Sequence, residues 1–530
     1  MAKKTCKRIS LGIVCLILFL MIAACGAPKE EQTTTTAKSS ETAKTTEAEK
    51  IKFSYMLPTK FVNWMKNYVW YNELLKRMNA EIELIPGGDG NDYTKNVDLR
   101  MTSGDLPDAI IVNVAQKEVY GSQGAFVDMK PLIDKSASNI NKYLNDNPDL
   151  KMLLTTDGKI YGIPHENPLT TAVTFYREDM FNKAGITSVP RTIDELTEAL
   201  VKLKETYKTT EYFYPLTGRD DVLKSFFTTP FKAESNVDSN GKVHGIYGED
   251  IGGRNADIYS EGYKDLINWF RKLYAENLVD PEWITGAATE ESWESKMLTG
   301  KAAMFNDNIG RGVLFTENGK KTDPNYAMKA MMPLLDKDGK QTILTGKHRF
   351  PNDRYFVINI KSENTDNIMK FLDYLYSEEG KTLASWGIEN VTYKVEGGKK
   401  VFIVDPVTEL NKPTGEINYG PYQDRLTFPH PCDNNAFYEF NDPTTKAVAT
   451  EFFTKYAKWY PLFKYTPKQL EERSNLMAQV KEALGAYEVK FITGKLPMSE
   501  WDNFLKDMES KGYKRIVEID QAAYDAINKK

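Results

Sequence analysis

The residue types that usually carry enzyme chemistry form no recognised motif in this chain of 530 residues. There are four histidines, at His165, His244, His348 and His430, and no two of them have the H-E-x-x-H spacing of a catalytic zinc site. The sequence also lacks the G-x-S-x-G nucleophile elbow and the G-x-x-x-x-G-K phosphate loop. These patterns point away from zinc-dependent proteolysis, serine hydrolysis and nucleotide-dependent chemistry.

Carboxylates are abundant instead, with 74 Asp and Glu residues in the chain. A glycoside hydrolase needs two carboxyl groups roughly 5–10 Å apart. With so many acids, some pair would meet that requirement in almost any fold, and no motif singles out a particular pair. An enzyme that acts on polysaccharide is therefore an alternative that the residues leave open.

Two short acidic segments, Asp238–Gly241 and Asp336–Gly339, have part of the pattern of a calcium loop. An EF-hand loop requires glycine at its sixth position and a bidentate glutamate at its twelfth. In the first segment Glu249 is twelfth but the glycine is fourth, and in the second Lys337 lies inside the loop. Both are better explained as tight turns between strands, so the residues predict no metal site and no cofactor.

The N-terminal segment has the pattern of a secretory signal peptide. A short basic region is followed by an apolar run from Ile9 to Ala24, which is short for a membrane span of about 20 residues. The run ends in small residues before Cys25. Residues 27–50 contain no aromatic residue and no aliphatic residue larger than alanine, which predicts a disordered segment. The alternative is an uncleaved signal anchor in which Cys25 is incidental.

The cysteine count, chain length and net charge limit which folds and partners are expected. Cleavage before Cys25 would leave Cys432 as the other cysteine, so no disulfide framework is expected, and Cys432 is interpreted as a bystander thiol. Roughly 480 residues follow the disordered segment, more than one core usually spans, which predicts two lobes. The formal charge of −5 becomes −9 without the four basic residues of the signal. This charge argues against nucleic acid as a partner.

Beyond residue 50, strand and helix periodicities alternate. The predicted strands are 51–57, 80–85, 109–112, 160–163, 172–176, 302–305 and 355–360. The predicted helices are 61–78, 92–103 with Gly104 as its C-terminal cap, 193–205, 364–376, one opened by Thr466 and Pro467, and a last one capped by Ser499 that extends to 509. The early alternation predicts a parallel sheet covered on both faces, in an α/β fold with helical excess toward the C-terminus.

Several short motifs occur in an order that resembles a known family. They are SGDLPD at 103–108, GAFVDM at 124–129, DGKIYGIP at 157–164, YRED at 176–179, PRTIDEL at 190–196, GKAAM at 300–304, YSEEG at 376–380, WGIE at 386–389, FITGK at 491–495 and WD at 501–502. The set resembles the extracellular solute-binding proteins (family 1, sugar-binding class) of bacterial ABC importers, and its late members resemble the long Gram-positive lipoprotein subgroup. One departure is Asn390, where that subgroup usually has a second glycine.

This resemblance implies a two-lobed, periplasmic-binding-protein-like fold of type II with a ligand cleft between the lobes. Lobe 1 is expected to hold residues 51–165 and 326–385, and lobe 2 residues 166–325 and 386–530. The small residues before Cys25 resemble a lipobox, which implies a signal peptide at 1–24, a palmitate-type lipid on Cys25 and a tether at 25–50. The protein would then be held at the extracellular face of the membrane as a monomer.

The function implied by the resemblance is binding and not catalysis. The protein would capture an oligosaccharide and deliver it to ABC transporter permease subunits. Some relatives hold structural calcium, so a structural calcium ion is a secondary expectation. A polysaccharide-active enzyme and a receptor that presents sugar to a membrane sensor kinase are the alternatives.

The candidate ligand-binding residues follow from where such a fold binds ligand, at loops beyond the carboxyl ends of strands. Sugars need aromatic platforms and bidentate polar groups. The candidates are Lys60, Asn63, Trp64, Asn113, Gln116, Glu166, Arg219, Asn306, Asp307, Arg349, Tyr422 and Phe437. For Trp64 a core role is an equal alternative, because it is in line with Tyr71 and Leu74 on one helical face. For Arg219 the alternative is a solvated ion pair with Asp220.

Overall fold

Two separate sheets organise the chain in the computed structural model, which describes residues 50–169, 173–219, 227–247, 256–341, 344–345, 349–350, 354–403, 427–439 and 441–528. Contacts divide the chain into Met1–Ala48 and Glu49–Lys530, and the fold below is that of the second unit. The predicted signal peptide, Cys25 and Tyr422 lie outside the described residues. Among the helices that are described, none combines the length and the apolar character that a membrane span requires.

The first sheet is mixed. Its strands run in the order β2 (Ala80–Pro86), β1 (Ile51–Leu57), β3 (Ala109–Val112), β13 (Tyr355–Ile358) and β6 (Ile163–Pro164). β1 is parallel to β2 and β3, as predicted, whereas β13 is antiparallel to both β3 and β6. The predicted parallel arrangement is therefore confirmed for the three early strands, and the sheet is mixed because the chain comes back to it at β13 in the opposite direction.

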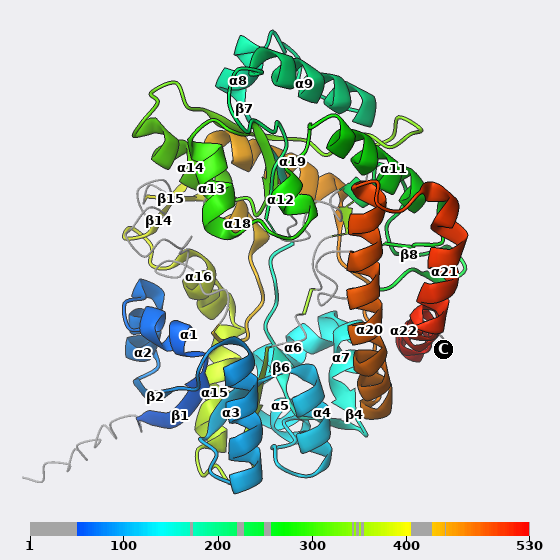
Figure 1. The fold of residues 1–530 in the computed structure, drawn as a ribbon. Coiled ribbons are helices and arrows are strands. Elements are labelled where there is room, and N and C mark those ends of the chain that lie inside the picture. Colours follow the sequence, from blue (N-terminus) through cyan, green and yellow to red (C-terminus); the bar gives the residue numbers. More distant parts are fainter. Residues whose placement is uncertain are drawn as a thin grey trace, which may run out of the picture. The chain divides into compact units, whose positions relative to one another are not determined.

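Helices surround this sheet and bury it (Figure 1). They are α1 (Thr59–Met65), α2 (Val69–Arg77), α3 (Gly90–Ser103), α4 (Val114–Ser122), α5 (Lys130–Ser136), α6 (Ser138–Asp146), α7 (Pro148–Leu154), α15 (Thr365–Leu375) and α16 (Glu378–Trp386). All four residues of β3 are buried, as expected for a strand that is covered on both faces. α3 ends at Gly104 in the left-handed conformation, which confirms the predicted cap.

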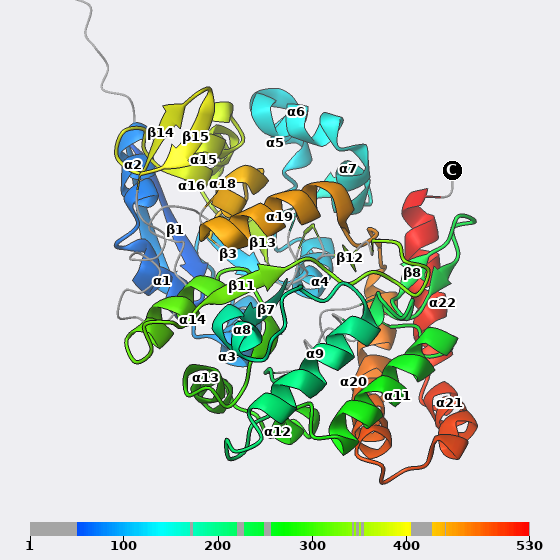
Figure 2. The ribbon, with the colours of Figure 1, turned by 90° about the horizontal axis from the view of Figure 1, so that it is seen from above.

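The second sheet has three antiparallel strands with β7 (Val173–Arg177) between β10 (Met304–Asp307) and β11 (Met328–Met331). Figure 2 shows these strands between α19 on one side and α9 on the other. The helices of this half are α8 (Glu178–Lys183), α9 (Ile193–Thr206), α11 (Glu261–Ala275), α12 (Pro281–Ile284), α13 (Glu290–Leu298), α14 (Arg311–Lys320), α18 (Asn434–Glu439) and α19 (Pro443–Tyr456). Gly312 lets α14 approach the sheet, since a Cβ there would lie 2.4 Å from the ring of Phe175.

Hydrophobic packing gives each sheet its own core. Two segments join a different core from the one expected. β11 was expected in the first lobe, but it pairs with β7, and Leu334 still packs in the second core, so the boundary expected at residue 326 lies later. Phe428 was expected in the second lobe, but it packs in the first core against Tyr55. Pairing with β7 places β11 in the second half, and packing against Tyr55 places Phe428 in the first core.

Short hairpins and the C-terminal helices complete the unit. The hairpins are β4 (Thr155–Thr156) with β5 (Lys159–Ile160), β8 (Asn236–Val237) with β9 (Val243–His244), and β14 (Tyr393–Glu396) with β15 (Lys399–Phe402), and β12 (Leu344–Thr345) pairs with β16 (Ala457–Lys458). The last helices are α20 (Pro467–Ile492), α21 (Trp501–Ser510) and α22 (Tyr513–Asn528). Thr466 forms the predicted capping box, whereas Ser499 lies in a 3-10 turn before α21 and a further helix follows. α20 packs on both α11 and α4, and therefore lies along both cores (Figure 1).

The two acidic segments are turns, as predicted. The Asp238 carboxylate accepts from the backbone amides of Asn240 and Lys242 at 2.8 and 3.0 Å. The Asp336 carboxylate accepts from the amides of residues 338 and 340 at 2.9 Å each. Within the described part of the chain no group of three or more His, Cys, Asp or Glu residues is arranged to hold a metal ion. Asn390, which stands in place of a glycine, adopts a left-handed φ of 62°.

Glu234 should make the stability of the second half depend on pH. Burial raises the pKa of its carboxyl from 4.5 to about 7, with Lys232 opposing that rise and Asp336 adding to it. Because the folded state holds the proton more tightly than the unfolded state, stability is highest below pH 4.5 and falls as pH rises toward about 7. We expect this contribution of Glu234 to fall by about 3 kcal/mol.

Urea unfolding of Glu234→Gln and of wild type between pH 5 and 8 tests this expectation. The variant should lose most of the decline and be the more stable protein at pH 8. Glu276→Gln, which replaces an exposed carboxylate in the same half, is the matched control. An unchanged pH profile in Glu234→Gln would contradict the assignment.

Candidate ligand-binding site

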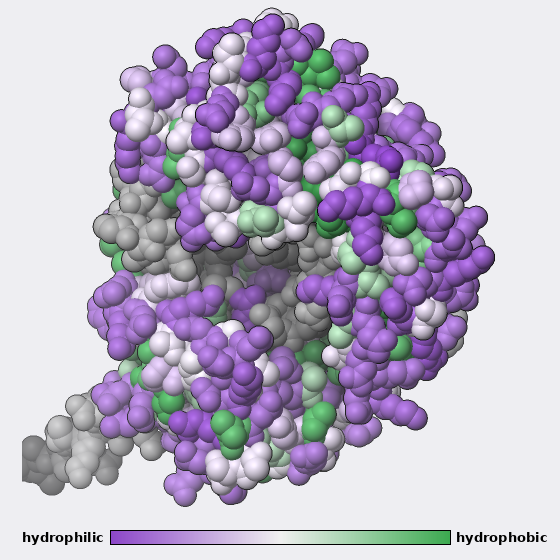
Figure 3. All heavy atoms as spheres, in the orientation of Figure 1, coloured by the Kyte–Doolittle hydropathy of each residue, from purple (hydrophilic) through white to green (hydrophobic). Residues whose placement is uncertain are grey.

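The register of the strands shows which ends of the two sheets are connected. The segment that leaves β6 at Pro164 enters β7 at Val173, and β13 begins at Tyr355 after the chain has left β11. Tyr355 pairs with Val112 in the first sheet, and Val173 pairs with Asp307 in the second. The carboxyl end of β3 and the Asp307 end of β10 are thus the ends joined by the crossing segments. Figure 3 shows the surface hollowed between the upper and lower halves.

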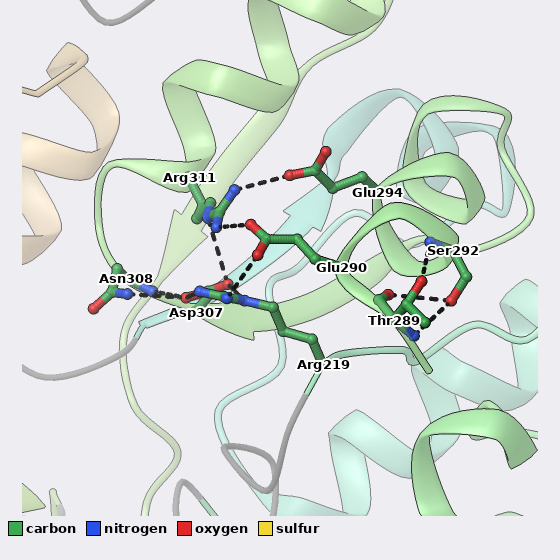
Figure 4. Close-up of polar contacts among 8 residues, drawn as sticks. All are labelled: Arg219, Thr289, Glu290, Ser292, Glu294, Asp307, Asn308 and Arg311. Atoms are coloured by element: carbon green, nitrogen blue, oxygen red, sulfur yellow. Dashed lines mark hydrogen bonds and ion pairs between the residues drawn. The ribbon is translucent and has the colours of Figure 1, made fainter. Parts of the chain in front are cut away.

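The end of β10 carries a group of charged side chains that we call the arginine–carboxylate cluster: Arg219, Glu290, Glu294, Asp307 and Arg311 (Figure 4). Arg219 donates to Asp307 from Nε at 2.8 Å and from Nη2 at 3.3 Å. It also donates from Nη1 to Glu290 at 3.3 Å. Arg311 donates to Glu294 at 2.9 Å and also to Glu290, and its Nε lies 3.6 Å from Asp307. The cluster thus shares three carboxylates between two guanidinium groups.

Local structure explains why these side chains meet. Asp307 is the last residue of β10, and Arg311 is the first residue of α14. α13 starts at a capping box in which the Thr289 side chain accepts from the Ser292 amide. This start fixes the helical phase, so Glu290 and Glu294 are one turn apart on the face toward Arg311 (Figure 4).

The cluster has a buried side and an exposed side. Both guanidinium groups lie over the ring of Trp293, at 5.5 Å for Arg219 and 5.4 Å for Arg311. The Trp293 side chain is fully buried and Asp307 is 3% exposed, whereas Glu290 is 46% exposed. Burial raises the pKa of Glu294 above its usual range, and Glu290 adds to that rise while Arg311 opposes it. Glu290 and Glu294 are therefore the charged side chains of the cluster that are most exposed to solvent.

A second polar group lies where the chain crosses between the sheets. The Glu166 carboxylate, on the first crossing, accepts from Arg349 Nε at 2.6 Å on the second crossing. It also accepts from the Cys432 backbone amide at 2.9 Å. Cys432 lies on a third crossing segment, between Phe428 in the first core and α18 in the second half. The Tyr143 hydroxyl donates to the same carboxylate at 2.9 Å, and burial together with Glu166 raises the pKa of Tyr143. Asn147 accepts from Arg349 at 3.0 Å. One carboxylate thus links three of the segments that pass between the two cores.

Some candidate residues next to the first sheet are hydrogen-bonded within the protein, and others are exposed. Asn113 and Gln116 form the capping box of α4, and Gln116 also donates to Asp98 at 2.9 Å, so their polar groups are used within the protein. Lys60 and Asn63 are exposed, and the Lys60 ammonium lies 5.9 Å from the ring of the half-buried Trp64. Lys60 and Trp64 are therefore together, and Trp64 also contacts the core.

Two candidates of the second half are buried. Asn306 donates to the Thr174 hydroxyl at 3.1 Å, and its Oδ1 has no hydrogen-bond partner within the described part of the chain. Phe437 packs in the second core and is 5% exposed, too little for a sugar platform in this conformation. His165 is buried beside His430 at 5.9 Å, and burial holds its pKa well below its usual range, which fits a structural role.

The sequence named Arg219 and Asp307 among the candidates but missed Glu290 and Glu294, which belong to the same cluster. Their signal was the capping residue Thr289 followed by acids in the first turn of a helix. Trp283 and Trp293 are both buried. The structure therefore brings together Arg219 with Asp307, Glu166 with Arg349, and Lys60 with Trp64, as three separate groups.

A cavity of about 370 Å³ lies at the other end of the first sheet. It is lined by residues of the SGDLPD and GAFVDM motifs, including Gly104, Leu106 and Ala125, and by Ile360 and Lys361 beyond β13. Gly104 and Leu106 precede β3, and Ile360 and Lys361 follow β13, so the cavity is at the end of the sheet opposite the crossing segments. It is therefore separate from the candidate site.

Comparison with known proteins identifies the family and the fold. A family model described as bacterial extracellular solute-binding protein matches residues 67–382. The fructooligosaccharide ABC transporter substrate-binding protein FusA of Streptococcus pneumoniae serotype 4 is 23% identical over 483 residues, which cover 82% of this chain and 83% of that protein. The polygalacturonan/rhamnogalacturonan-binding protein YtcQ of Bacillus subtilis is 21% identical over 482 residues, which cover 88% of this chain and 86% of that protein.

Among solved structures, the alginate-binding protein AlgQ2 without calcium ion superposes with a TM-score of 0.69 at 22% identity, and the match covers 90% of this chain and 99% of that one. This likeness confirms the predicted two-lobed α/β fold. The family expected from the order of the motifs is confirmed by the model match, which spans more than half of the sequence. The chain belongs to the bacterial extracellular solute-binding protein family.

Proposed function

We propose that this protein is a lipid-anchored receptor that captures an oligosaccharide and delivers it to the permease of an ABC importer. The observation that carries the proposal is the placement of paired arginine and carboxylate groups at the joined ends of two sheets, in a chain of the solute-binding family. Carboxylates and guanidinium groups in such a place can bind the hydroxyl groups of a sugar in pairs. The relatives named for a fructooligosaccharide and for a polygalacturonan support a glycan ligand.

Calorimetric titration of residues 50–530 against a panel of plant and bacterial glycans tests the ligand class. At least one oligosaccharide is expected to bind with a micromolar or tighter dissociation constant. A micromolar constant corresponds to a binding free energy of about −8 kcal/mol. Tight binding of a peptide or metal ion, with no binding to any glycan, would refute the assignment. A glycan that is cleaved during incubation would instead identify the protein as an enzyme.

The division of labour within the fold is also part of the proposal. The two cores act as two lobes that close on the ligand by bending at the crossing segments. The family match supports this motion, as do the hydrogen bonds that join Glu166 on one crossing segment to Arg349 and Cys432 on two others. Genes beside this one separate import from sensing, because permease genes indicate an importer and a lone membrane kinase gene indicates a sensor.

Replacement of Cys25 by alanine should abolish lipid attachment and leave the signal segment uncleaved. If a lipid on Cys25 is the anchor, the variant loses both lipid attachment and cleavage before residue 25. Metabolic labelling with an alkyne fatty acid should mark wild type and not Cys25→Ala, and the variant should migrate as the longer, uncleaved chain. Cys432→Ala, which removes the half-buried cysteine of the folded unit, should keep the label. Labelling of Cys25→Ala equal to wild type would contradict the anchor.

A further inference from the structure

We propose that the oligosaccharide is uncharged, and that Glu290 and Glu294 exclude uronic-acid glycans. The inference rests on the proposed function and deepens it by naming the ligand class. The relatives do not decide this point, since fructooligosaccharides are neutral whereas polygalacturonan and alginate carry a carboxylate on their sugar units. The pairing of the arginines in the arginine–carboxylate cluster and at the crossing segments favours a neutral ligand.

Recognition of a uronate requires a guanidinium or ammonium group with donors to spare, because the carboxylate binds such groups in bidentate pairs. In the arginine–carboxylate cluster these donors are used. Arg219 directs Nε and Nη2 to Asp307 and Nη1 to Glu290. Arg311 directs its two terminal nitrogens to Glu294 and Glu290. Two cations face three carboxylates, which gives the ionised cluster a net charge of −1.

The same arrangement exists at the crossing segments. Arg349 donates to Glu166 at 2.6 Å, to Asn147 at 3.0 Å and to Tyr143 at 3.2 Å. Its charge is balanced by Glu166, whose side chain is 10% exposed. Each arginine of the candidate site is therefore matched to a carboxylate of the protein, and an incoming uronate would have to displace it.

Exposure sets the direction of the electrostatic effect. The guanidinium groups have Trp293 on one side and carboxylates on the other, and Arg311 is 10% exposed. Glu290, at 46% exposed, is the charged group of the cluster most open to solvent. An anionic glycan would meet like charge here, whereas a neutral sugar can donate its hydroxyl protons to the Glu290 carboxylate.

A matched pair of ligands tests the ligand class. Oligogalacturonides and their fully methyl-esterified forms share a backbone and differ only in charge, and neutral fructans, xylans and mannans complete a calorimetric panel. Neutral members should bind, with affinity that changes less than about twofold between 20 and 500 mM NaCl, because no ionic pair with the ligand is broken by screening. Binding of a uronate that is at least about tenfold tighter than any neutral member overturns the inference and leaves the proposed function intact. Absence of binding to every glycan overturns both.

Substitution of the two glutamates tests the mechanism of exclusion. Glu290→Gln with Glu294→Gln keeps the shape of α13 and releases donors of both arginines. This double variant should bind the best neutral ligand about tenfold more weakly and should gain measurable, salt-sensitive affinity for oligogalacturonides. Glu291→Gln is the matched control, because it removes an exposed carboxylate of the same helix outside the cluster. A double variant that binds both ligand types as wild type does would show that these glutamates do not set the specificity.

Discussion

Asp307→Asn is expected to weaken glycan binding by at least about 100-fold while the protein stays folded. Asp307 is 3% exposed and accepts from two nitrogens of Arg219, at 2.8 and 3.3 Å. It also accepts from the backbone amide of Asn308 at 2.6 Å. Loss of its charge leaves Arg219 with Glu290 as its remaining carboxylate in the cluster. Both guanidinium groups then lose the position that Trp293 and Asp307 define together.

A comparable pair at the other end of β7 separates binding from stability. Arg177 donates to Asp179 at 2.6 and 2.7 Å and lies over the ring of Tyr326, at the end of the sheet that is remote from the crossing segments. Asp179→Asn should therefore lower the free energy of unfolding by about 3 kcal/mol, much as Asp307→Asn does. It should change the affinity less than about twofold, because distant sites act independently.

Calorimetry with the best glycan and urea unfolding of both variants give the comparison. If Asp179→Asn weakens binding as much as Asp307→Asn, the loss reflects general destabilisation, and the cluster is not the binding site. If Asp307→Asn binds normally, the ligand site lies elsewhere on the joined ends of the sheets.

The sequence was sufficient for the early strands and helices because each is short, strongly periodic and bounded by turn residues. β1, β3 and the Gly104 cap occur where the pattern predicted them. The predicted helix at 61–78 is instead two helices, α1 and α2, separated at residues 66–68. β10 begins two residues later than predicted, at Met304, because Asn306 and Asp307 pair with Thr174 and Val173. Strand bounds of this kind are set by a partner strand more than a hundred residues away.

The candidate site was harder to predict than the fold. Asp307 and Arg219 were found because each follows an apolar stretch, but their 88-residue separation gives no sign that they form an ion pair. Gln116 also follows a strand, yet its amide closes a capping box and binds Asp98. A polar residue after a strand can thus serve the helix that follows it or the ligand. Only the three-dimensional approach of α13 to β10 distinguishes these two uses.

Glu166→Gln should affect the closing of the two lobes as well as the free energy of unfolding. Glu166 accepts hydrogen bonds from two other crossing segments. Its carboxylate accepts from Arg349 at 2.6 Å and from the Cys432 amide at 2.9 Å. Loss of its charge leaves a partly buried arginine without its carboxylate, which should lower the free energy of unfolding by about 3 kcal/mol. The three crossings then no longer move together, and the closed, ligand-holding arrangement becomes a smaller fraction of the population. The apparent affinity falls in proportion to the population of the closed arrangement. We expect the apparent affinity to fall about tenfold.

Small-angle X-ray scattering and stopped-flow binding measure this effect, with Asp108→Asn as the matched control. The Asp108 carboxylate also joins three segments, accepting from Ser54 at 2.8 Å, from Ser362 at 2.6 Å and from Asn364 at 3.3 Å, but all of them belong to the first half of the molecule. Both variants should be less stable than wild type. Only Glu166→Gln should show a wider radius of gyration with ligand bound and a faster dissociation rate. Equal compaction and equal dissociation rates in the two variants would mean that the crossing segments bend without help from Glu166, and that its bonds serve stability alone.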